Sequence, residues 1–257
     1  AMLGMNEMIL HSAGDDTIIE YAKNIEQAGK TLLFLINGIL DFSKMEDGKM
    51  ELVETEYSTL EYIQNLKLSI EERAKGKGLL FLLDIDETLP SRLYGDDVHI
   101  AQVVVNLLTN AVKYTEQGMV KLIIKGKEKT DDTIRIYTEV RDTGIGIREE
   151  DRERLFLPFE RLDEERNRGI EGTGLGMPIV RKLLTMMHSE LELESVYRVG
   201  STFSFTLPSI SVPVKANVIA TEISPTARIH ITPIFSAVVH SFNPLTSSIS
   251  HISYLNM

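Results

Sequence analysis

The sequence has no cysteine, no long hydrophobic run and little positive charge. None of its 257 residues is a cysteine, which excludes a disulfide scaffold and any cysteine-based zinc site. A chain without cysteine also fits a reducing compartment. The longest apolar run, at 32–40, is too short to span a bilayer and contains Asn37 and Gly38. The net charge of -11 argues against general nucleic-acid binding, because such binding needs basic patches.

No signal peptide is evident, and the sequence opens inside a helical pattern. We therefore expect a cytoplasmic location, and membrane anchoring of a longer parent protein stays open. Hydrophobic residues make up 43% of the chain and charged residues 25%, which is ordinary for a soluble globular protein. A chain of this length suits one large or two small domains.

Residues 1–50 are predicted to form a helical hairpin with its turn near 11–16. In the second helix, apolar or small residues recur at alternating steps of four and three, the heptad pattern of a helix packed lengthwise on other helices. They are Ile18, Ala22, Ile25, Gly29, Leu32, Ile36 and Ile39. An intramolecular hairpin would satisfy this pattern, but one hairpin buries too little surface to be stable alone, which favours a homodimer.

Residues 51–208 are predicted to form a domain with one sheet and helices on one face, which is an α+β arrangement. Helical patterns cover 58–75, 103–114 and 177–188, and strand patterns cover 78–86, 119–129, 133–142, 191–199 and 201–208. Residues 209–257 contain only three charged residues, Lys215, Glu222 and Arg228, and have no helical periodicity. This tail reads equally as a linker, as weak strands or as sequence outside the native fold.

The helix at 103–114 carries polar residues at an unusual place. Its core stripe consists of Val104, Leu107, Leu108, Ala111 and Val112. On the opposite stripe lie Gln102, Asn106, Asn110 and Lys113. An amide oxygen is a hard ligand that suits Mg²⁺, and a lysine one turn further along can pair with phosphate. The alternative is that these polar side chains simply face solvent.

Two glycine clusters favour the first interpretation. In 141–150, Asp142 directly follows a predicted strand and precedes Gly144 and Gly146. Glycines let the backbone approach a flat ring, and the carboxylate can accept a hydrogen bond from the exocyclic amine of adenine. The second cluster, GTGLGM at 172–177, opens a helix, so its backbone N–H groups can meet phosphates.

Two other nucleotide folds fit poorly. GTGLGM follows a charged loop and has the spacing G-x-G-x-G, whereas a dinucleotide fold needs G-x-G-x-x-G after a strand. The P-loop signature G-x-x-x-x-G-K-[ST] does not occur in the sequence.

Four segments, in this order, resemble the motifs of sensor histidine kinases. NLLTNAVKYT resembles the N box, RDTGIGI the G1 box, LFLPFERLD the F box and GTGLGM the G2 box. The resemblance extends over roughly residues 1–208. It implies the Bergerat ATP-binding fold, a two-layer α/β sandwich preceded here by a truncated α-helical hairpin, with ATP and Mg²⁺ as cofactors.

The resemblance also implies roles for individual residues. Asn110 would ligate Mg²⁺, Asn106 would lie near the metal and the phosphates, and Arg161 is a candidate for contacting the γ-phosphate. Phe156 and Phe159 would anchor a mobile lid. The other residues that the resemblance assigns to the nucleotide pocket are Lys113, Tyr114, Asp142, Gly144, Ile145, Gly146, Gly172, Thr173, Gly174, Leu175 and Gly176.

The expected reaction is phosphoryl transfer to a histidine. Gyrase- and chaperone-type relatives activate water with a glutamate one turn before the main asparagine, but this sequence has Asn106 there, and an amide cannot act as a general base. Residues 1–10 resemble the segment that follows the family's phosphoacceptor box, so the acceptor histidine is expected to lie outside this chain. His11 lacks the acceptor pattern.

The expected partner is the receiver domain of a response regulator. Residues 209–257 contain no aspartate, so no receiver domain is encoded in this tail. Two other functions stay open: a non-catalytic nucleotide-sensing or scaffold module, and a serine kinase of the anti-sigma type. The hairpin argues against the anti-sigma type, because that class has no such hairpin.

Overall fold

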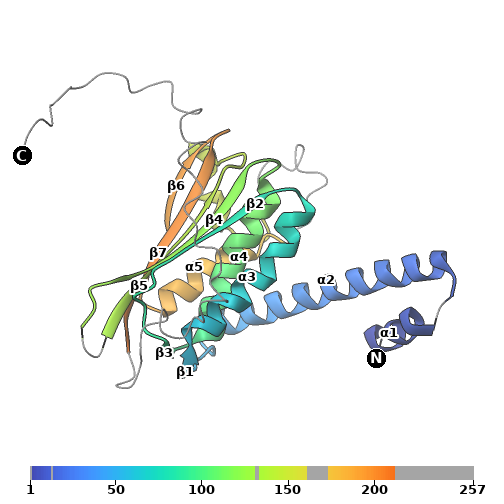
Figure 1. Ribbon diagram of the computed structural model, residues 1–257, viewed down its shortest axis with the longest axis horizontal. Coiled ribbons are helices and arrows are strands. Elements are labelled where there is room, and N and C mark those ends of the chain that lie inside the picture. The colour runs from blue at the N-terminus through green and yellow to red at the C-terminus, as the bar shows by residue number, and fades with distance from the viewer. Residues whose placement is uncertain (1, 13, 131–132, 161–172, 212–257) are drawn as a thin grey trace, which may run out of the picture. The chain divides into compact units, whose positions relative to one another are not determined.

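The computed structural model describes residues 2–12, 14–130, 133–160 and 173–211 (Figure 1). Its first two helices are α1 (Met2–Ser12) and α2 (Asp16–Glu46). Asp15 caps α2, because its Oδ1 accepts hydrogen bonds from the N–H groups of Thr17 at 2.8 Å and Ile18 at 3.4 Å. In the part of the chain that is described, no helix is long and apolar enough to cross a membrane.

The two helices pack on each other near one small residue of the heptad pattern. The side-chain amide of Asn6 on α1 donates to the carbonyl of Ala22 at 2.7 Å, and both residues are buried. Most of the other heptad positions are open to solvent within one chain; Ile25 is 45% exposed and Leu32 is 52% exposed. The apolar stripe of α2 is therefore largely uncovered in a single chain.

The rest of the described chain alternates strands and helices. Its elements are β1 (Thr55–Ser58), α3 (Thr59–Gly76), β2 (Leu80–Ile85), β3 (Arg92–Gly95), α4 (Asp97–Tyr114), β4 (Met119–Lys127), β5 (Thr133–Asp142), α5 (Gly176–Met186), β6 (Glu192–Val196) and β7 (Gly200–Ser211). Two single-turn 3-10 helices, Glu149–Asp151 and Arg154–Phe156, lie between β5 and α5.

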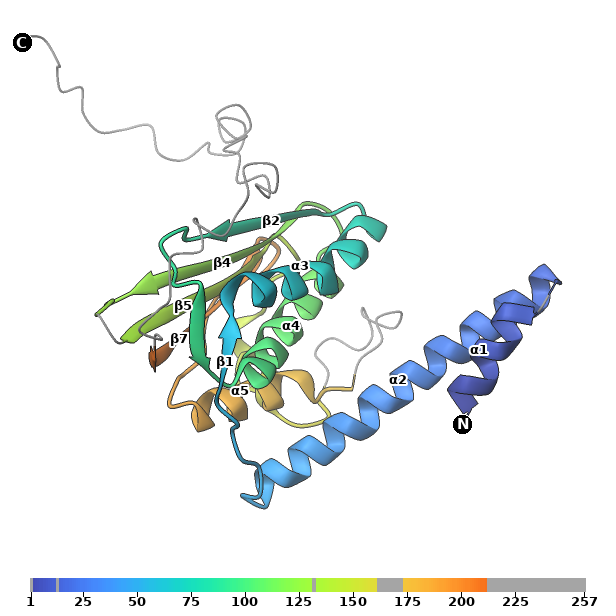
Figure 2. The ribbon, with the colours of Figure 1, turned by 60° about the horizontal axis from the view of Figure 1, so that its bottom comes forward.

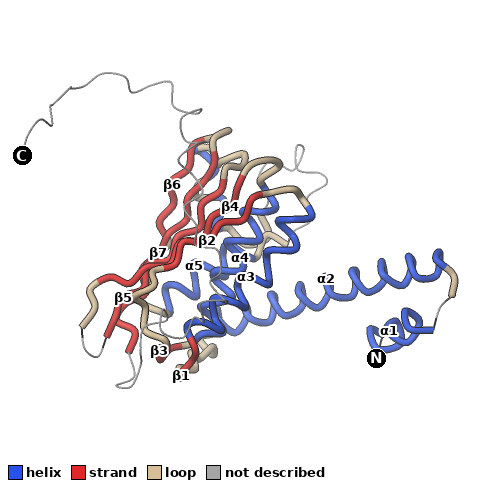
Figure 3. The backbone as a smooth tube through the Cα atoms, viewed as in Figure 1, coloured by secondary structure: helices blue, strands red, loops and turns tan. Residues whose placement is uncertain are grey.

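The strands form one seven-stranded sheet in the order β1-β3-β7-β5-β4-β2, with β6 paired to β7 (Figure 3). Every pairing is antiparallel except that of β2 with β4. Helices α3, α4 and α5 cover one face of the sheet (Figure 2). The predicted fold class, a two-layer α+β sandwich of the Bergerat type, is confirmed.

Several boundaries differ from the sequence prediction; helix α4 begins at Asp97 rather than at 103, and β6 ends at Val196 rather than at 199. The strands β1 and β3 were not expected, because four residues are too few to show an alternating pattern. Strand β7 continues past the expected boundary at 208, since Ile210 pairs with Ile134 and Ser211 with Thr133. The expected strand over 78–86 is shorter at both ends.

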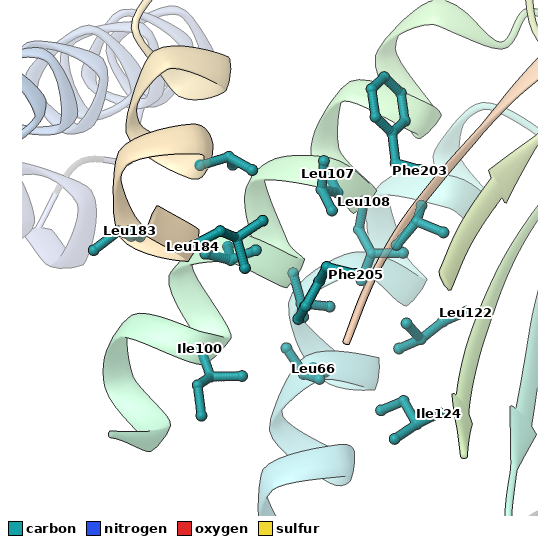
Figure 4. Packing of buried hydrophobic residues seen from close by; sticks show 14 of the residues in the cluster. Leu66, Ile100, Leu107, Leu108, Leu122, Ile124, Leu183, Leu184, Phe203 and Phe205 are labelled. Carbon is teal, nitrogen blue, oxygen red and sulfur yellow. The ribbon is translucent and has the colours of Figure 1, made fainter. Parts of the chain in front are cut away.

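The core lies between the helices and the sheet. The predicted core stripe of α4 is confirmed, and Leu107 and Leu108 are almost fully buried. They face Phe203 and Phe205 of β7, while Leu183 and Leu184 of α5 pack beside them (Figure 4). This packing fixes which face of α4 is turned away from the sheet.

Asp96 holds the N-terminus of α4 in place. Its Oδ1 accepts the N–H of His99 at 3.0 Å, and its Oδ2 accepts the N–H of Val53 at 2.7 Å and lies 2.6 Å from Nδ1 of His99. Burial alone would raise the pKa of this carboxyl, but the hydrogen bonds from His99 and Val53 outweigh it and lower the pKa. The ionised carboxylate thus ties the helix to the segment before β1.

We predict that Asp96→Ala lowers the free energy of unfolding by about 2 kcal/mol at neutral pH, through the lost cap and the lost bond to Val53. Because the folded-state pKa is lowered, this stabilisation is present above the ordinary pKa of about 4 and disappears as the pH falls through the folded value. Urea unfolding at several pH values measures it. Glu71→Ala, which removes an exposed pair with Lys67, is the control. A pH-independent difference between wild type and Asp96→Ala would contradict this assignment.

Candidate functional site

The polar stripe of α4 lies on the face that turns away from the sheet, and its residues are half-buried. Asn106 faces the start of α5. If Gly176 carried a side chain, the Cβ atom of that side chain would lie 3.6 Å from Oδ1 of Asn106. Gln102 turns towards α2 instead, where its Nε2 donates to Oδ2 of Asp41 at 3.4 Å. The stripe therefore divides into a first residue, Gln102, that contacts the hairpin and a second, Asn106, that lies beside the start of α5.

The C-terminal end of α4 carries Lys113 and Tyr114. The Lys113 ammonium lies 4.8 Å from the centroid of the Tyr114 ring. Lys77, which directly follows α3, caps this end of α4. Its Nζ donates to the carbonyls of Val112 at 2.9 Å, Lys113 at 2.8 Å and Thr115 at 3.3 Å. A cation is favourable here, since the last carbonyls of a helix carry partial negative charge.

Asp142 ends β5 in a nearly closed environment, with 8% of its surface exposed. Its Oδ1 accepts the N–H groups of Gly144 at 2.8 Å and Ser201 at 3.3 Å. Burial raises the pKa of this carboxyl, and the two N–H groups oppose the rise. Within the described residues, its Oδ2 receives no hydrogen bond, so this oxygen can accept one from a ligand.

The loop after β5 packs directly onto the end of α4. A Cβ on Gly144 would lie 2.4 Å from the carbonyl oxygen of Tyr114, which leaves room for glycine alone. The N–H of Ile145 donates to that same carbonyl at 3.2 Å. Gly146 meets the backbone of Val196 on β6 in the same way. These contacts bring the Asp142 carboxylate and the end of the polar stripe to one place.

The second glycine cluster contacts the segment that precedes it. Gly174 has a φ of +71°, and a Cβ there would lie within 2.8 Å of the Phe159 backbone. The N–H of Phe159 donates to the Gly174 carbonyl at 3.2 Å, and Phe159 itself has a φ of +63°. The Phe159 side chain is 63% exposed. These two residues lie close to the two ends of 161–172, which is not described.

The start of α5 is ordered by short-range contacts. Oγ1 of Thr173 accepts the N–H of Leu175 at 3.1 Å, and Leu175 is almost fully buried. On the same helix, the Arg181 guanidinium lies 5.1 Å from the centroid of the Phe156 ring. Two of the predicted site residues, Arg161 and Gly172, lie outside the described residues.

The two asparagine amides of α4 suit one kind of metal ion. No group of three or more His, Cys, Asp or Glu side chains that could hold a metal occurs in the described ranges. The amide oxygens of Asn106 and Asn110 are hard neutral ligands, which fit Mg²⁺ because that ion keeps several waters and binds substrate phosphates. They do not suit a structural zinc site.

Two residues that hold Asp142 and the end of α4 in place are not among the predicted site residues. Ser201 supplies an N–H to Asp142 from 59 positions away, and Lys77 caps α4 from 36 positions before Lys113. Neither residue belongs to a recognisable local pattern. Only the pairing of β5 with β7, and the packing of α3 beside α4, bring them to the site.

Comparison with known proteins gives consistent results. A family model described as histidine kinase-, DNA gyrase B-, and HSP90-like ATPase matches residues 95–211. The hybrid signal transduction histidine kinase B of Dictyostelium discoideum is 37% identical over 209 residues, which cover 80% of this chain and 10% of that protein. This chain therefore spans only a small part of that relative's length.

Two solved structures are similar in fold. Full-length ShkA in complex with AMPPNP matches with a TM-score of 0.67 and 26% identity, over 82% of this chain and 43% of ShkA. The histidine kinase ThkA in complex with the response regulator TrrA matches with a TM-score of 0.54 and 24% identity, over 80% of this chain and 56% of ThkA. At that identity, the second likeness concerns the fold alone.

We predict that Lys77→Met lowers the free energy of unfolding by about 1 kcal/mol, because three carbonyls at the end of α4 lose a cationic donor. Amide hydrogen exchange at residues 111–115 is expected to become faster, and urea unfolding measures the stability. Lys75→Met, on the same turn of α3, is the matched control. Equal effects of the two substitutions would show that Lys77 does not cap α4.

Proposed function

Residues 95–211 form an ATPase domain of the type shared by histidine kinases, DNA gyrase B and HSP90, and from that premise we propose that the chain is the ATP-binding catalytic core of a sensor histidine kinase. The observation that carries this proposal is the contact between the loop after β5 and the end of α4. It brings a buried carboxylate to the end of the helix that carries the two amides and the lysine.

In this proposal, Oδ2 of Asp142 accepts a hydrogen bond from the adenine amine, which selects ATP over GTP. Gly144, Ile145 and Gly146 hold the loop flat beneath the base. Lys113 pairs with phosphate, and Tyr114 lines the pocket. The AMPPNP named in the ShkA structure supports an adenine nucleotide as the ligand.

The phosphates would lie between α4 and the start of α5. Helix α5 begins at Gly176, and a helix N-terminus favours anions, so we assign Thr173, Gly174, Leu175 and Gly176 to the phosphates. Asn110 and Asn106 would hold Mg²⁺, whose charge neutralises the phosphates. Phe156 would anchor the segment that covers them, and Arg161 and Gly172, which the structure does not describe, complete the proposed set.

The proposed reaction is transfer of the γ-phosphoryl group to a histidine. Transfer of this kind depends mainly on positioning and on charge neutralisation. Asn106 stands where hydrolytic relatives have a glutamate, so the pocket contains no general base at that position to activate water. We propose that the acceptor histidine lies on a helical segment outside this chain.

Two partners follow from this proposal. The exposed heptad stripe of α2 supports a homodimer through the hairpin, because a helix with exposed Ile25 and Leu32 gains stability by covering them. The second partner is the receiver domain of a response regulator, which the complex of ThkA with TrrA supports. For this function we assign 1–50 to the dimerisation hairpin, 51–208 to the ATP-binding domain with β7 running on to 211, and 209–257 to a tail.

The nucleotide site can be tested by calorimetric binding of AMPPNP with Mg²⁺. Asn110→Ala is expected to weaken binding at least tenfold through the lost metal ligand, and Asp142→Asn by a similar factor, since each removes a charge-assisted or metal contact of about 1.5–3 kcal/mol. Asn24→Ala, on exposed α2, is the control. If the wild type binds no AMPPNP, the scaffold function replaces the kinase.

Transfer can be tested with radiolabelled ATP and a supplied dimerisation domain that contains its phosphoacceptor histidine. We expect label on the added domain and none on this chain. Ile25→Glu is expected to reduce the labelling several-fold without weakening AMPPNP binding, because a charge in the heptad stripe opposes helix pairing. Label on this chain alone, or no label while AMPPNP binds, would contradict the proposed transfer.

A further inference from the structure

A second cavity lies on a different side of α4, away from the two amides. It is open to solvent on one side, has a volume of about 520 Å³ and is lined by residues of β1, α3, β3 and α4. The α4 side chains that line it are Asp97, Val98, Ala101 and Val105. None of the residues assigned to the nucleotide site lines it. A volume of this size suits a small ligand or a single long side chain.

Two tyrosines line this cavity. The rings of Tyr57 and Tyr62 lie 5.7 Å apart at an angle of 55°, and Tyr57 is only 9% exposed. Within the described residues, neither hydroxyl has a hydrogen-bond partner. Burial raises the pKa of both hydroxyls, and the negative charge of Asp97 raises it further, so both stay protonated. Tyr62 is half-buried, and a polar group inside the cavity would give both hydroxyls the partner that they lack.

The charges around the cavity are mostly negative. Glu56, Glu61 and Asp97 line it together with one cation, Arg92, whose Nη1 lies 3.2 Å from Oε1 of Glu56. Among the described residues, Glu61 and Asp97 have no cationic partner. Both lie in the first turn of a helix, where the helix dipole stabilises a carboxylate. That position explains the charges but not the unpartnered hydroxyl of the buried Tyr57 beside them.

We propose that this cavity binds an organic cation, a guanidinium or ammonium group on an aliphatic stem. Glu61 and Asp97 accept hydrogen bonds from the cation, and the tyrosine hydroxyls accept further ones. The faces of the two rings add cation–π attraction. Val98, Ala101 and Val105 offer an apolar wall for the stem, as in other sites that hold long basic side chains.

The same chemistry has two possible sources, a free amine and a basic side chain of a protein. Two probes separate them: agmatine, and the blocked tripeptide acetyl-Ala-Arg-Ala-amide. The neutral tripeptide acetyl-Ala-Gln-Ala-amide is the negative control. Binding is followed in the amide NMR spectrum of the whole chain, with and without AMPPNP. Because the cavity lies apart from the amides of α4, binding is expected even if the chain binds no nucleotide.

We expect saturable shifts confined to residues 56–66 and 92–105, with a dissociation constant of about 1 mM or lower. The double substitution Glu61→Gln and Asp97→Asn should weaken binding roughly tenfold or more, through the loss of charge-assisted bonds. Tyr57→Phe, which removes only one hydroxyl and keeps the packing, should weaken it roughly threefold. Glu71→Gln, on α3 outside the cavity, should change nothing.

Tighter binding of agmatine would assign the site to a free amine, and tighter binding of the arginine tripeptide to a partner's side chain. Either result supports the proposal. The proposal fails if neither cation saturates, if the glutamine tripeptide binds equally well, or if the charge substitutions leave the affinity unchanged while the variants stay folded.

Discussion

The site depends on one close contact between backbones, that of Gly144 with the carbonyl of Tyr114. A side chain at 144 would overlap that oxygen, and the N–H of Ile145 donates to the same carbonyl. The contact fixes the distance between the buried Asp142 carboxylate and the last turn of α4. Without it, the two halves of the site would sit on separate elements, each free to move with its own strand or helix.

The supports of this contact come from both sides. Lys77 holds the end of α4 through three carbonyls, while Asp96 holds its start. On the sheet side, Oδ1 of Asp142 accepts the N–H groups of Gly144 and Ser201, which fixes the orientation of the carboxylate. Both ends of the helix and one oxygen of the carboxylate thus take part in bonds that hold the fold together.

Helix α4 serves several surfaces at once because a helix presents several faces. Leu107 and Leu108 pack into the core, Asn106 faces α5, and Gln102 contacts Asp41 on the hairpin. A further face, with Val98 and Val105, borders the cavity that we assign to an organic cation. An occupant of any one surface therefore acts on the same rigid element as the others.

The sequence by itself determined the elements with a clear period and the local motifs. The core stripe of α4, the long strands β4 and β5 and the glycine clusters could all be read locally, because burial on one face imposes a period of 3.6 or 2. Only the tertiary structure decided the rest. The four-residue strands β1 and β3, the hydrogen bonds of Lys77 and Ser201, and the turn of Gln102 towards Asp41 all join residues that are far apart in the chain. Such contacts follow from how the helices and the sheet pack together, and a local sequence pattern does not carry that information.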